Sequence, residues 1–401
     1  MRAVTVAALV LAPALVHAES TGTLGETRPT VNHTSSVVGG SDAPLGKWPD
    51  AAAVLFNGQQ GCTGTLIAPT VAITAGHCNS SQLTSILVGT ASLDRVADGE
   101  VLPVARRIEH PEIDVTVLVL GQASRFAPRP IASGWAKFDI KNGASVAIVG
   151  YGAIDRNASQ GTDALQEAMS TITDFDCSVK SGCQGGGGEL GAGGNGIDSC
   201  NGDSGGPLYL VTDYGSFLVG VTSRAYNDAT DPCGEGGIYG RPDTIVDFID
   251  QQAGVAVARA PEPTAERIVA IRGDGGETEI LHNDPKSESH TYTLTTPPTM
   301  GTAKVRADGR VRVCVDKEAV PGDNDSLVVT VADTTDPTRS VPVKVQIAIA
   351  VNQSDGRCDV DKFEVAEGDE SGGCCDSGRS AGGALPLSVL VLLVLRRRRR
   401  R

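Results

Sequence analysis

The stretch DSCNGDSGGPL, residues 198–208, places Ser204 within a run of glycines. Glycines around a serine usually form only a loop, because glycine accepts backbone conformations that other residues avoid. A serine hydroxyl attacks a carbonyl only when a neighbouring base takes its proton. A catalytic role for Ser204 would therefore require a histidine or a carboxylate from elsewhere in the chain.

Two motifs earlier in the chain could supply those groups. They are TAGHC at residues 74–78, and HP at residues 110–111 followed by DVTVL at residues 114–118. A neutral imidazole can accept a proton near pH 7. Each motif alone could be structural, since a lone histidine or an Asp before an apolar run commonly is. The joint occurrence in the order His77, Asp114, Ser204 favours a catalytic triad.

Together the three motifs resemble those of the trypsin-like serine endopeptidases of the chymotrypsin fold, over residues 37–252. The order of the triad separates this family from subtilisins and α/β-hydrolases. The resemblance implies that Ser204 is the nucleophile, that His77 is its general base and that Asp114 orients the imidazole. It also implies an oxyanion hole formed by the backbone N–H groups of Gly202 and Ser204.

The same resemblance places Asp198 at the base of the pocket for the residue before the cleaved bond. A carboxylate there selects Arg or Lys, because a buried carboxylate without a partner is costly and the substrate cation supplies one. Gly237 matches the small residue that leaves such a pocket open.

The strand expected to pair with the substrate backbone runs through Ser223, Arg224 and Ala225. Arg224 stands where the family usually has Trp, and Ala225 stands where it usually has Gly. We therefore count all three as substrate-binding residues, and the two departures leave pocket width and subsite preference open.

The sequence VVGG at residues 37–40 resembles the mature N-terminus of the family, whose freed ammonium pairs with the Asp before the nucleophile, here Asp203. The resemblance implies a zymogen that a cut before Val37 activates. Ser36 precedes that bond, and Pro29 follows the nearest upstream basic residue, Arg28. An enzyme selecting basic residues could not readily cut there, so we expect activation in trans by a protease of different specificity.

The two ends of the chain have the composition of targeting segments. Residues 1–18 combine Arg2, an apolar run and small residues at a cleavage site, which predicts a secretory signal peptide followed by a propeptide at 19–36. A transmembrane anchor is the competing interpretation, but the run is short for a span. At the other end, two cysteines, an apolar run at 384–395 and six terminal arginines resemble a myxobacterial-type C-terminal sorting tag at 374–401. A plain tail anchor with a transmembrane helix is the alternative.

Ten cysteines in an exported chain indicate disulfides, although sequence alone cannot give their connectivity. The family resemblance implies three pairs and leaves a fourth candidate: Cys62–Cys78, Cys177–Cys183, Cys200–Cys233 and Cys314–Cys358. Residues 184–196 hold eight glycines in thirteen positions. We expect this insertion to be a mobile loop beside the pocket, either a tolerated insertion, which is favoured, or a loop whose ordering tunes specificity.

A length of 401 residues predicts two or three domains, and 49 glycines with 4% aromatics suggest loop-rich β structure. Short apolar runs at 51–55, 71–74, 116–120 and 145–149 predict strands, and the pattern at 245–249 predicts a closing helix. We therefore predict an all-β, two-barrel chymotrypsin-like protease domain at 37–252, with a linker at 253–267.

Residues 268–351 alternate apolar and polar positions, which predicts a small immunoglobulin-like or cadherin-like β-sandwich. Asp308-Gly309 is a hairpin signal, and residues 321–325 form an acidic turn that could bind calcium but is more simply a turn. An acidic spacer at 352–373 follows.

These features predict a secreted or cell-surface serine endopeptidase that cleaves after Arg or Lys through an acyl-enzyme. Its expected partners are protein or peptide substrates, an activating protease and the sorting machinery, while a net charge of −14 argues against nucleic acid. No metal or cofactor is expected, because His33, His282 and His290 lack ligand spacing. The alternative is a catalytically idle protease-fold protein for surface adhesion or binding, which the complete set of catalytic residues disfavours. A third interpretation keeps the enzyme and lets the domain at 268–351 tether or aim it at a surface.

Overall fold

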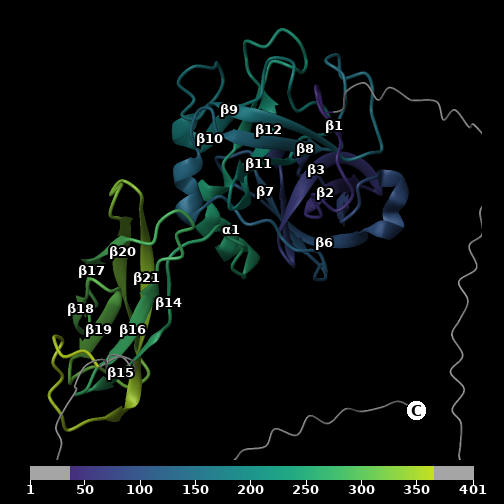
Figure 1. Ribbon diagram of the computed structural model, residues 1–401. Helices are drawn as coiled ribbons and strands as arrows, with labels where there is room; N and C mark the ends of the chain where they lie inside the picture. Colours follow the sequence, from purple (N-terminus) through teal and green to yellow (C-terminus); the bar gives the residue numbers. More distant parts are fainter. Residues whose placement is uncertain (1–36, 365–401) are drawn as a thin grey trace, which may run out of the picture. The chain divides into compact units, whose positions relative to one another are not determined.

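The computed structural model describes residues 37–364 (Figure 1). The predicted signal peptide, propeptide and sorting tag lie outside the described residues, as does the end of the predicted spacer. The described residues form two compact units: one holds 37–264 with 281–291 and 330–343, and the other holds 265–280, 292–329 and 344–364. Within 37–364, no helix is long and apolar enough to cross a membrane.

Six strands close into a first barrel. In spatial order they are β2 (Ala51–Phe56), β3 (Gln59–Ala68), β4 (Val71–Thr74), β7 (Thr116–Leu120), β6 (Glu100–Glu109) and β5 (Leu83–Val88). All four residues of β4 are buried, as are five of the six in β2. The apolar runs at 51–55, 71–74 and 116–120 thus form strands, because a barrel interior buries aliphatic side chains from every strand.

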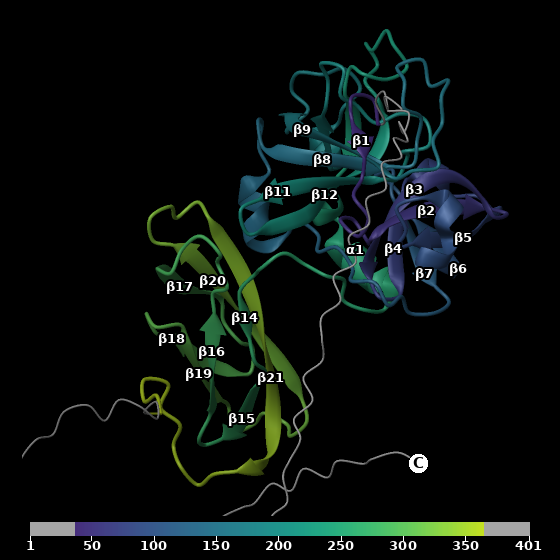
Figure 2. The same cartoon turned by 45° about the vertical axis from the view of Figure 1, so that its right-hand side comes forward.

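A second barrel follows in the chain (Figure 2). Its sheet runs in the order β1 (Ser41–Asp42), β9 (Gln166–Asp174), β10 (Glu189–Ala192), β13 (Gly237–Gly240), β12 (Gly215–Ala225), β11 (Pro207–Thr212) and β8 (Ser145–Gly150). Pairing of β8 with β9 closes six of these strands into a ring. One apolar cluster takes residues from both barrels, including Ile73 and Val117 of the first and Tyr209 and Leu218 of the second.

The expectation of a mobile loop at residues 184–196 is wrong. A short 3₁₀ turn, η4 (Gly185–Gly187), leads into β10, whose four residues are all buried. Leu190 pairs with Tyr239 of β13 and is fully buried in the second barrel. The glycines turn the chain at the ends of β10, since Gly188 and Gly193 have φ of 80° and 87°. A four-residue strand is too short to show its period within such a run.

Short helical turns complete the first unit. They are η1 (Gly76–Cys78), η2 (Leu93–Asp98), η3 (Gly134–Asp139), η5 (Pro242–Thr244) and the α-helix α1 (Val246–Ala253). The predicted closing helix is therefore confirmed. It buries Val246 and Ile249 and ends at Gly254, which has φ of 73°.

Two four-stranded sheets make up the C-terminal region. One has the order β14 (Thr264–Ala265), β16 (Gly276–Leu281), β19 (Arg310–Val315), β18 (Gly301–Val305), and the other β15 (Ile268–Arg272), β21 (Ser340–Gln353), β20 (Asn324–Asp333), β17 (His290–Thr296). The hairpin predicted at Asp308-Gly309 joins β18 and β19, with Val305 opposite Val311. The likeness to immunoglobulin or cadherin domains stays a prediction.

Four disulfides cross-link the described chain. Three are in the barrel unit and one is in the C-terminal region: Cys62–Cys78, Cys177–Cys183, Cys200–Cys233 and Cys314–Cys358. The first two bonds close loops of 16 and 6 residues, and the third ties the segment before Ser204 to the segment before β13.

Candidate active site

His77 and Asp114 meet at the edge of the first barrel. His77 lies in η1, directly after β4, and Asp114 lies just before β7, which pairs with β4. Asp114 Oδ1 accepts the backbone N–H of His77 at 2.8 Å, and Oδ2 lies 2.8 Å from His77 Nδ1. A Cβ at Gly76 would come within 2.8 Å of Asp114 Oδ1. The approach of these two residues therefore requires glycine at position 76.

The charges of this pair are set by its hydrogen bonds. Burial raises the pKa of Asp114, but hydrogen bonds from His77 and Ser223 outweigh it and lower that pKa to about 2. The hydrogen bond to Asp114 raises the pKa of His77, and burial opposes that rise. Asp114 is therefore ionised at neutral pH, while the imidazole keeps its ability to take up a proton.

Ser204 lies on a tight loop that the first barrel supports. Its carbonyl oxygen accepts the N–H of Thr63 at 2.9 Å. Gly205 has φ of 81°, and a Cβ there would lie 2.0 Å from Thr74 Oγ1 and 2.5 Å from Ala75 N. The glycine-rich sequence is thus a requirement of close packing between the Ser204 loop and β4. Among residues 37–364, no hydrogen bond joins Ser204 Oγ to His77.

The backbone beside Ser204 offers two free donors. The carbonyl of Gly202 accepts hydrogen bonds from Gln60 Nε2 at 3.1 Å and Thr63 Oγ1 at 2.9 Å, and the N–H of Asp203 donates to Cys200 O at 2.9 Å. The N–H groups of Gly202 and Ser204 donate to no other group in the described part of the chain. These are the two donors that the family resemblance assigns to an oxyanion hole.

Asp203 is fully buried behind this loop. Its oxygens accept the N–H groups of Gly152 and Cys200, each at 2.8 Å, and burial raises its pKa to about 7. Val37 is also fully buried, and the carbonyl of Val38 accepts the N–H of Asp198 at 3.0 Å. The segment that follows position 36 is therefore part of the second-barrel packing around the pocket.

A cavity of about 280 Å³ opens beside Ser204. It is lined by Asp198, Ser199, Cys200, Asn201, Ser204, Thr222, Ser223, Arg224, Ala225, Pro232, Cys233 and Gly237. Asp198 is only 3% exposed, and its Oδ2 accepts the N–H groups of Gly234 and Gly236 at 2.8 and 3.0 Å. Its Oδ1 has no hydrogen-bond partner among the described residues. Burial raises the pKa of Asp198 to about 6.

Gly237 leaves room in front of this carboxylate. A Cβ at position 237 would lie 3.5 Å from Asp198 Oδ1 and 3.6 Å from Ser199 Oγ. Any larger side chain would occupy the cavity. The unpaired oxygen at the base and the open space above it are the features that binding of a cationic side chain would require.

The predicted substrate-binding strand is the end of β12. Ser223 Oγ donates to Asp114 Oδ2 at 2.6 Å, so β12 also braces the pair on the first barrel. Arg224 forms an ion pair with Glu189 of β10, at 2.7 Å between Nη1 and Oε1, and Ala225 is exposed at the cavity mouth. The structure thus brings Ser204 and every predicted pocket residue to one cavity, and Ser223 connects that cavity to the Asp114–His77 pair.

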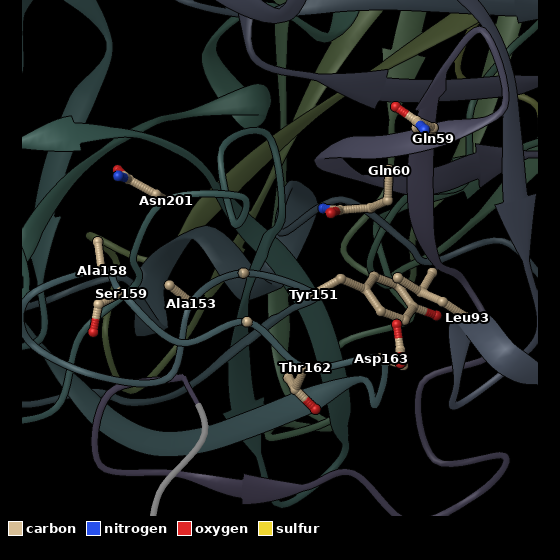
Figure 3. Close-up of a pocket in the computed structure, with 12 residues that line it drawn as sticks. Gln59, Gln60, Leu93, Tyr151, Ala153, Ala158, Ser159, Thr162, Asp163 and Asn201 are labelled. Atoms are coloured by element: carbon tan, nitrogen blue, oxygen red, sulfur yellow. The ribbon is translucent and has the colours of Figure 1, made fainter.

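A second cavity, of about 580 Å³, lies on the other side of Asn201, which lines both. Figure 3 shows two groups of side chains facing each other across it, with Asn201, Ala158 and Ser159 on one side and Gln60, Tyr151 and Leu93 on the other. Gln60 also donates a hydrogen bond to the Gly202 carbonyl, so this cavity borders the Ser204 loop.

Sequence reasoning missed Glu189 and Gln60. Glu189 is the only charged residue in the glycine-rich run, and an isolated acid in such a run is the one signal that could have marked it. Gln60 carries no signal in the sequence, because its contact with Gly202 spans 142 positions.

The described residues hold no group of three or more His, Cys, Asp or Glu side chains placed to bind a metal ion. In the acidic turn considered for calcium, Asp325 Oδ2 accepts the backbone N–H groups of Thr299 and Met300 at 2.8 and 2.7 Å. That carboxylate thus ties the acidic turn to residues 299–300.

Comparison with known proteins gives a consistent set of relatives. A profile described as Trypsin matches residues 37–249. Serine protease 56 of Homo sapiens is 31% identical over 280 residues, 62% of this chain and 44% of the relative. A trypsin of Saccharopolyspora erythraea is 31% identical over 238 residues, 54% of this chain and 97% of the relative. The chain therefore spans less than half the length of serine protease 56.

One solved structure is neuropsin, described as a serine protease expressed in the limbic system of mouse brain. It aligns with 53% of this chain and 98% of its own, at 25% identity and a TM-score of 0.45.

Proposed function

Because the chain belongs to the trypsin family, we propose that it is a serine endopeptidase that hydrolyses peptide bonds after Arg or Lys. The observation that carries the proposal is that Ser204 and the unpaired Asp198 oxygen lie on one cavity, and that Ser223 in its wall hydrogen-bonds Asp114, the partner of His77. A nucleophile, a base and a cation-binding carboxylate at one place are what this reaction requires.

The proposed reaction gives each group the role that the family resemblance implies for it. Ser204 Oγ attacks the scissile carbonyl and gives its proton to His77 Nε2, while Nδ1–H stays bonded to Asp114. The resulting oxyanion accepts hydrogen bonds from the free N–H groups of Gly202 and Ser204. His77 then protonates the leaving amine, which departs and leaves an acyl group on Ser204. Water, deprotonated by His77, attacks that ester, and His77 returns the proton to Ser204 Oγ as the ester C–O bond breaks and the acid leaves.

The preference for Arg or Lys rests on the buried base of the cavity. Asp198 has one oxygen held by two backbone N–H groups and one oxygen without a partner. A substrate cation offsets the cost of that buried charge, whereas an apolar side chain would leave it unpaired. Ser223, Arg224, Ala225 and Gly237 complete the proposed substrate-binding surface.

Activation by a cut before Val37 is part of the proposal. The freed ammonium would reach Asp203, whose burial and raised pKa mark a carboxylate that a cation would stabilise in its charged form. Since Ser36 precedes Val37, a protease of different specificity would make the cut. N-terminal sequencing of the active form should give Val37; full activity with another N-terminus would contradict this step.

The division of the chain into segments stays a prediction. We propose a signal peptide at 1–18, a propeptide at 19–36, the protease domain at 37–252 and a linker at 253–267. A β-sandwich at 268–351, an acidic spacer at 352–373 and a sorting tag at 374–401 follow, so that sorting machinery would leave the enzyme on the cell surface or release it. Deleting 268–351 should reduce attachment and leave peptide cleavage intact if this region only tethers the enzyme. Because 281–291 and 330–343 belong to the same compact unit as the barrels, loss of cleavage would instead show that the region is part of the catalytic fold.

The direct test compares peptides that differ only in Arg, Lys, Phe or Ala before the scissile bond, using protein processed to Val37. We expect fast cleavage after Arg and Lys, abolished by Ser204→Ala. Cleavage after other residues would show that Arg224 and Ala225 have changed the pocket. If verified Val37-start protein cleaves nothing, the alternative of an idle surface-binding protein replaces the proposal.

A further inference from the structure

A charged pair on two strands of the second barrel lies beside the candidate active site and is held by several hydrogen bonds. Arg224 lies on β12 and Glu189 lies on β10. The two Glu189 oxygens accept Nη1–H and Nη2–H of Arg224 at 2.7 and 3.0 Å, and Oε2 also accepts Gln184 N–H at 2.9 Å. Nη2 donates further to Gly182 O at 2.8 Å. The guanidinium is therefore clamped from two sides.

The other Nη1 hydrogen reaches the hydroxyl of Ser223. Arg224 Nη1 lies 3.0 Å from Ser223 Oγ, and that oxygen lies 2.6 Å from Asp114 Oδ2. A guanidinium can only donate, and a hydroxyl has one proton. Ser223 therefore accepts from Arg224 and must donate to Asp114. The guanidinium removes the hydroxyl's freedom to turn away from the carboxylate.

We propose that Arg224, clamped by Glu189, is a positioning residue that orients the Ser223–Asp114 hydrogen bond and thereby tunes the basicity of His77. This inference rests on the proposed function, in which His77 is the general base. A cation one hydroxyl away offsets part of the Asp114 charge that stabilises the imidazolium, and Glu189 in turn offsets part of the cation. The two partners therefore act on His77 with opposite signs.

Other ionisable side chains lie on the elements that surround Asp114. They lie on η1, β6, the loop before β7, the pocket base and η5: His77, Glu109, His110, Glu112, Asp198, Arg241 and Asp243. Arg241 and Asp243 pair with each other at 2.8 Å. Of these groups, only His77 hydrogen-bonds the Asp114 carboxylate within the described residues.

The test uses Arg224→Met, Glu189→Gln and a matched control, Arg125→Met, all processed to Val37. Arg125 also pairs with a glutamate, Glu100, at 3.2 Å and donates to a backbone carbonyl, but it lines neither cavity. The substrate is a single-residue arginine ester, which fills only the Asp198 pocket. The readout is kcat against pH, because in the bound complex the substrate cation keeps Asp198 ionised.

We expect the acid limb of the kcat profile to move by about 0.5 pH unit in opposite directions. Arg224→Met removes a cation, favours the imidazolium and should move the limb to higher pH. Glu189→Gln leaves the cation unopposed and should move it to lower pH. Arg224→Met should also lower kcat by about fivefold with KM changed less than twofold, while Arg125→Met should match the unsubstituted protein.

Proton NMR of the Nδ1–H resonance of His77 provides a second readout that needs no turnover, and it should show the same opposite shifts. Shifts of one sign in both variants, or none in either, would overturn the inference, since a merely structural role predicts no opposition. If the unsubstituted protein does not cleave the ester, the proposed function fails, and the NMR titration still decides whether the pair controls His77.

Discussion

The base and the rim of the Asp198 cavity are both charged, but their charges are satisfied differently. At the base, Asp198 keeps one oxygen without a partner among the described residues. At the rim, both Nη atoms of Arg224 bond within the protein, to Glu189, Ser223 and Gly182. An unpaired buried charge is costly until a ligand of opposite charge binds to it. A charge that is already paired within the protein needs no ligand and can hold its neighbours in place. We therefore propose that the base selects the substrate and that the rim positions the catalytic groups.

The largest effect is expected for Asp198→Ser, which removes the unpaired charge at the base of the cavity. Removing the carboxylate leaves the substrate cation unpaired in a buried cavity, so kcat/KM for Arg peptides should fall by roughly 10³-fold, with much less effect on Ala peptides. Steady-state kinetics on matched peptides measures this. Asp213→Ser, at an exposed turn between β11 and β12, is the control. An equal loss on both peptides would mean that Asp198 supports the fold and does not select the substrate.

Filling the cavity should have a smaller effect. Gly237→Val would place methyl groups beyond a Cβ that already lies 3.5 Å from Asp198 Oδ1, and we expect about a 100-fold loss of kcat/KM for Arg peptides by steric exclusion. Gly186→Val is the control, because a Cβ at Gly186 meets nothing within 4 Å. Unchanged Arg cleavage by Gly237→Val would show that the long side chain binds elsewhere.

The pH dependence of cation binding tests the role of Asp198 without a substitution at the base or the rim of the cavity. Since burial raises the pKa of Asp198 to about 6 and a cation needs the ionised carboxylate, the Kd of a small amidinium ligand should rise about tenfold per pH unit below that value and level off above it. Calorimetry with the Ser204→Ala protein would measure this. A neutral ligand of the same shape should show no such slope, and a flat profile for the cation would argue against contact with Asp198.

The smallest effect is expected at the rim position that carries no charge. Ala225 is exposed at the cavity mouth, and Ala225→Gly would remove one methyl group there. Because little buried surface is involved, KM for Arg peptides should change by less than about threefold. Progress curves on the matched peptides would detect it. A tenfold change would mean that Ala225 narrows the entrance, and the rim would then share in selectivity.

The C-terminal region shows how reliably local periodicity predicts strands. Alternation at 311–315, 327–331 and 341–349 falls within β19, β20 and β21. The glycine-rich run at 184–196 shows the opposite case. There Leu190 takes a place in the second barrel that only the pairing with β9 and β13 explains. The alternation of apolar and polar residues predicts a strand only where the strand is long enough for the alternation to repeat.

The sequence by itself predicted the triad residues, the carboxylate at the pocket base and the strands β2, β4, β7 and β8, because motif chemistry and short apolar runs are local. Only the tertiary structure decided that Glu189 clamps Arg224, that Ser223 donates to Asp114 and that Gln60 holds the Gly202 carbonyl. Each of these contacts joins positions 35 to 142 residues apart. Closure of the barrels brings them together, and no local pattern in the chain records that closure.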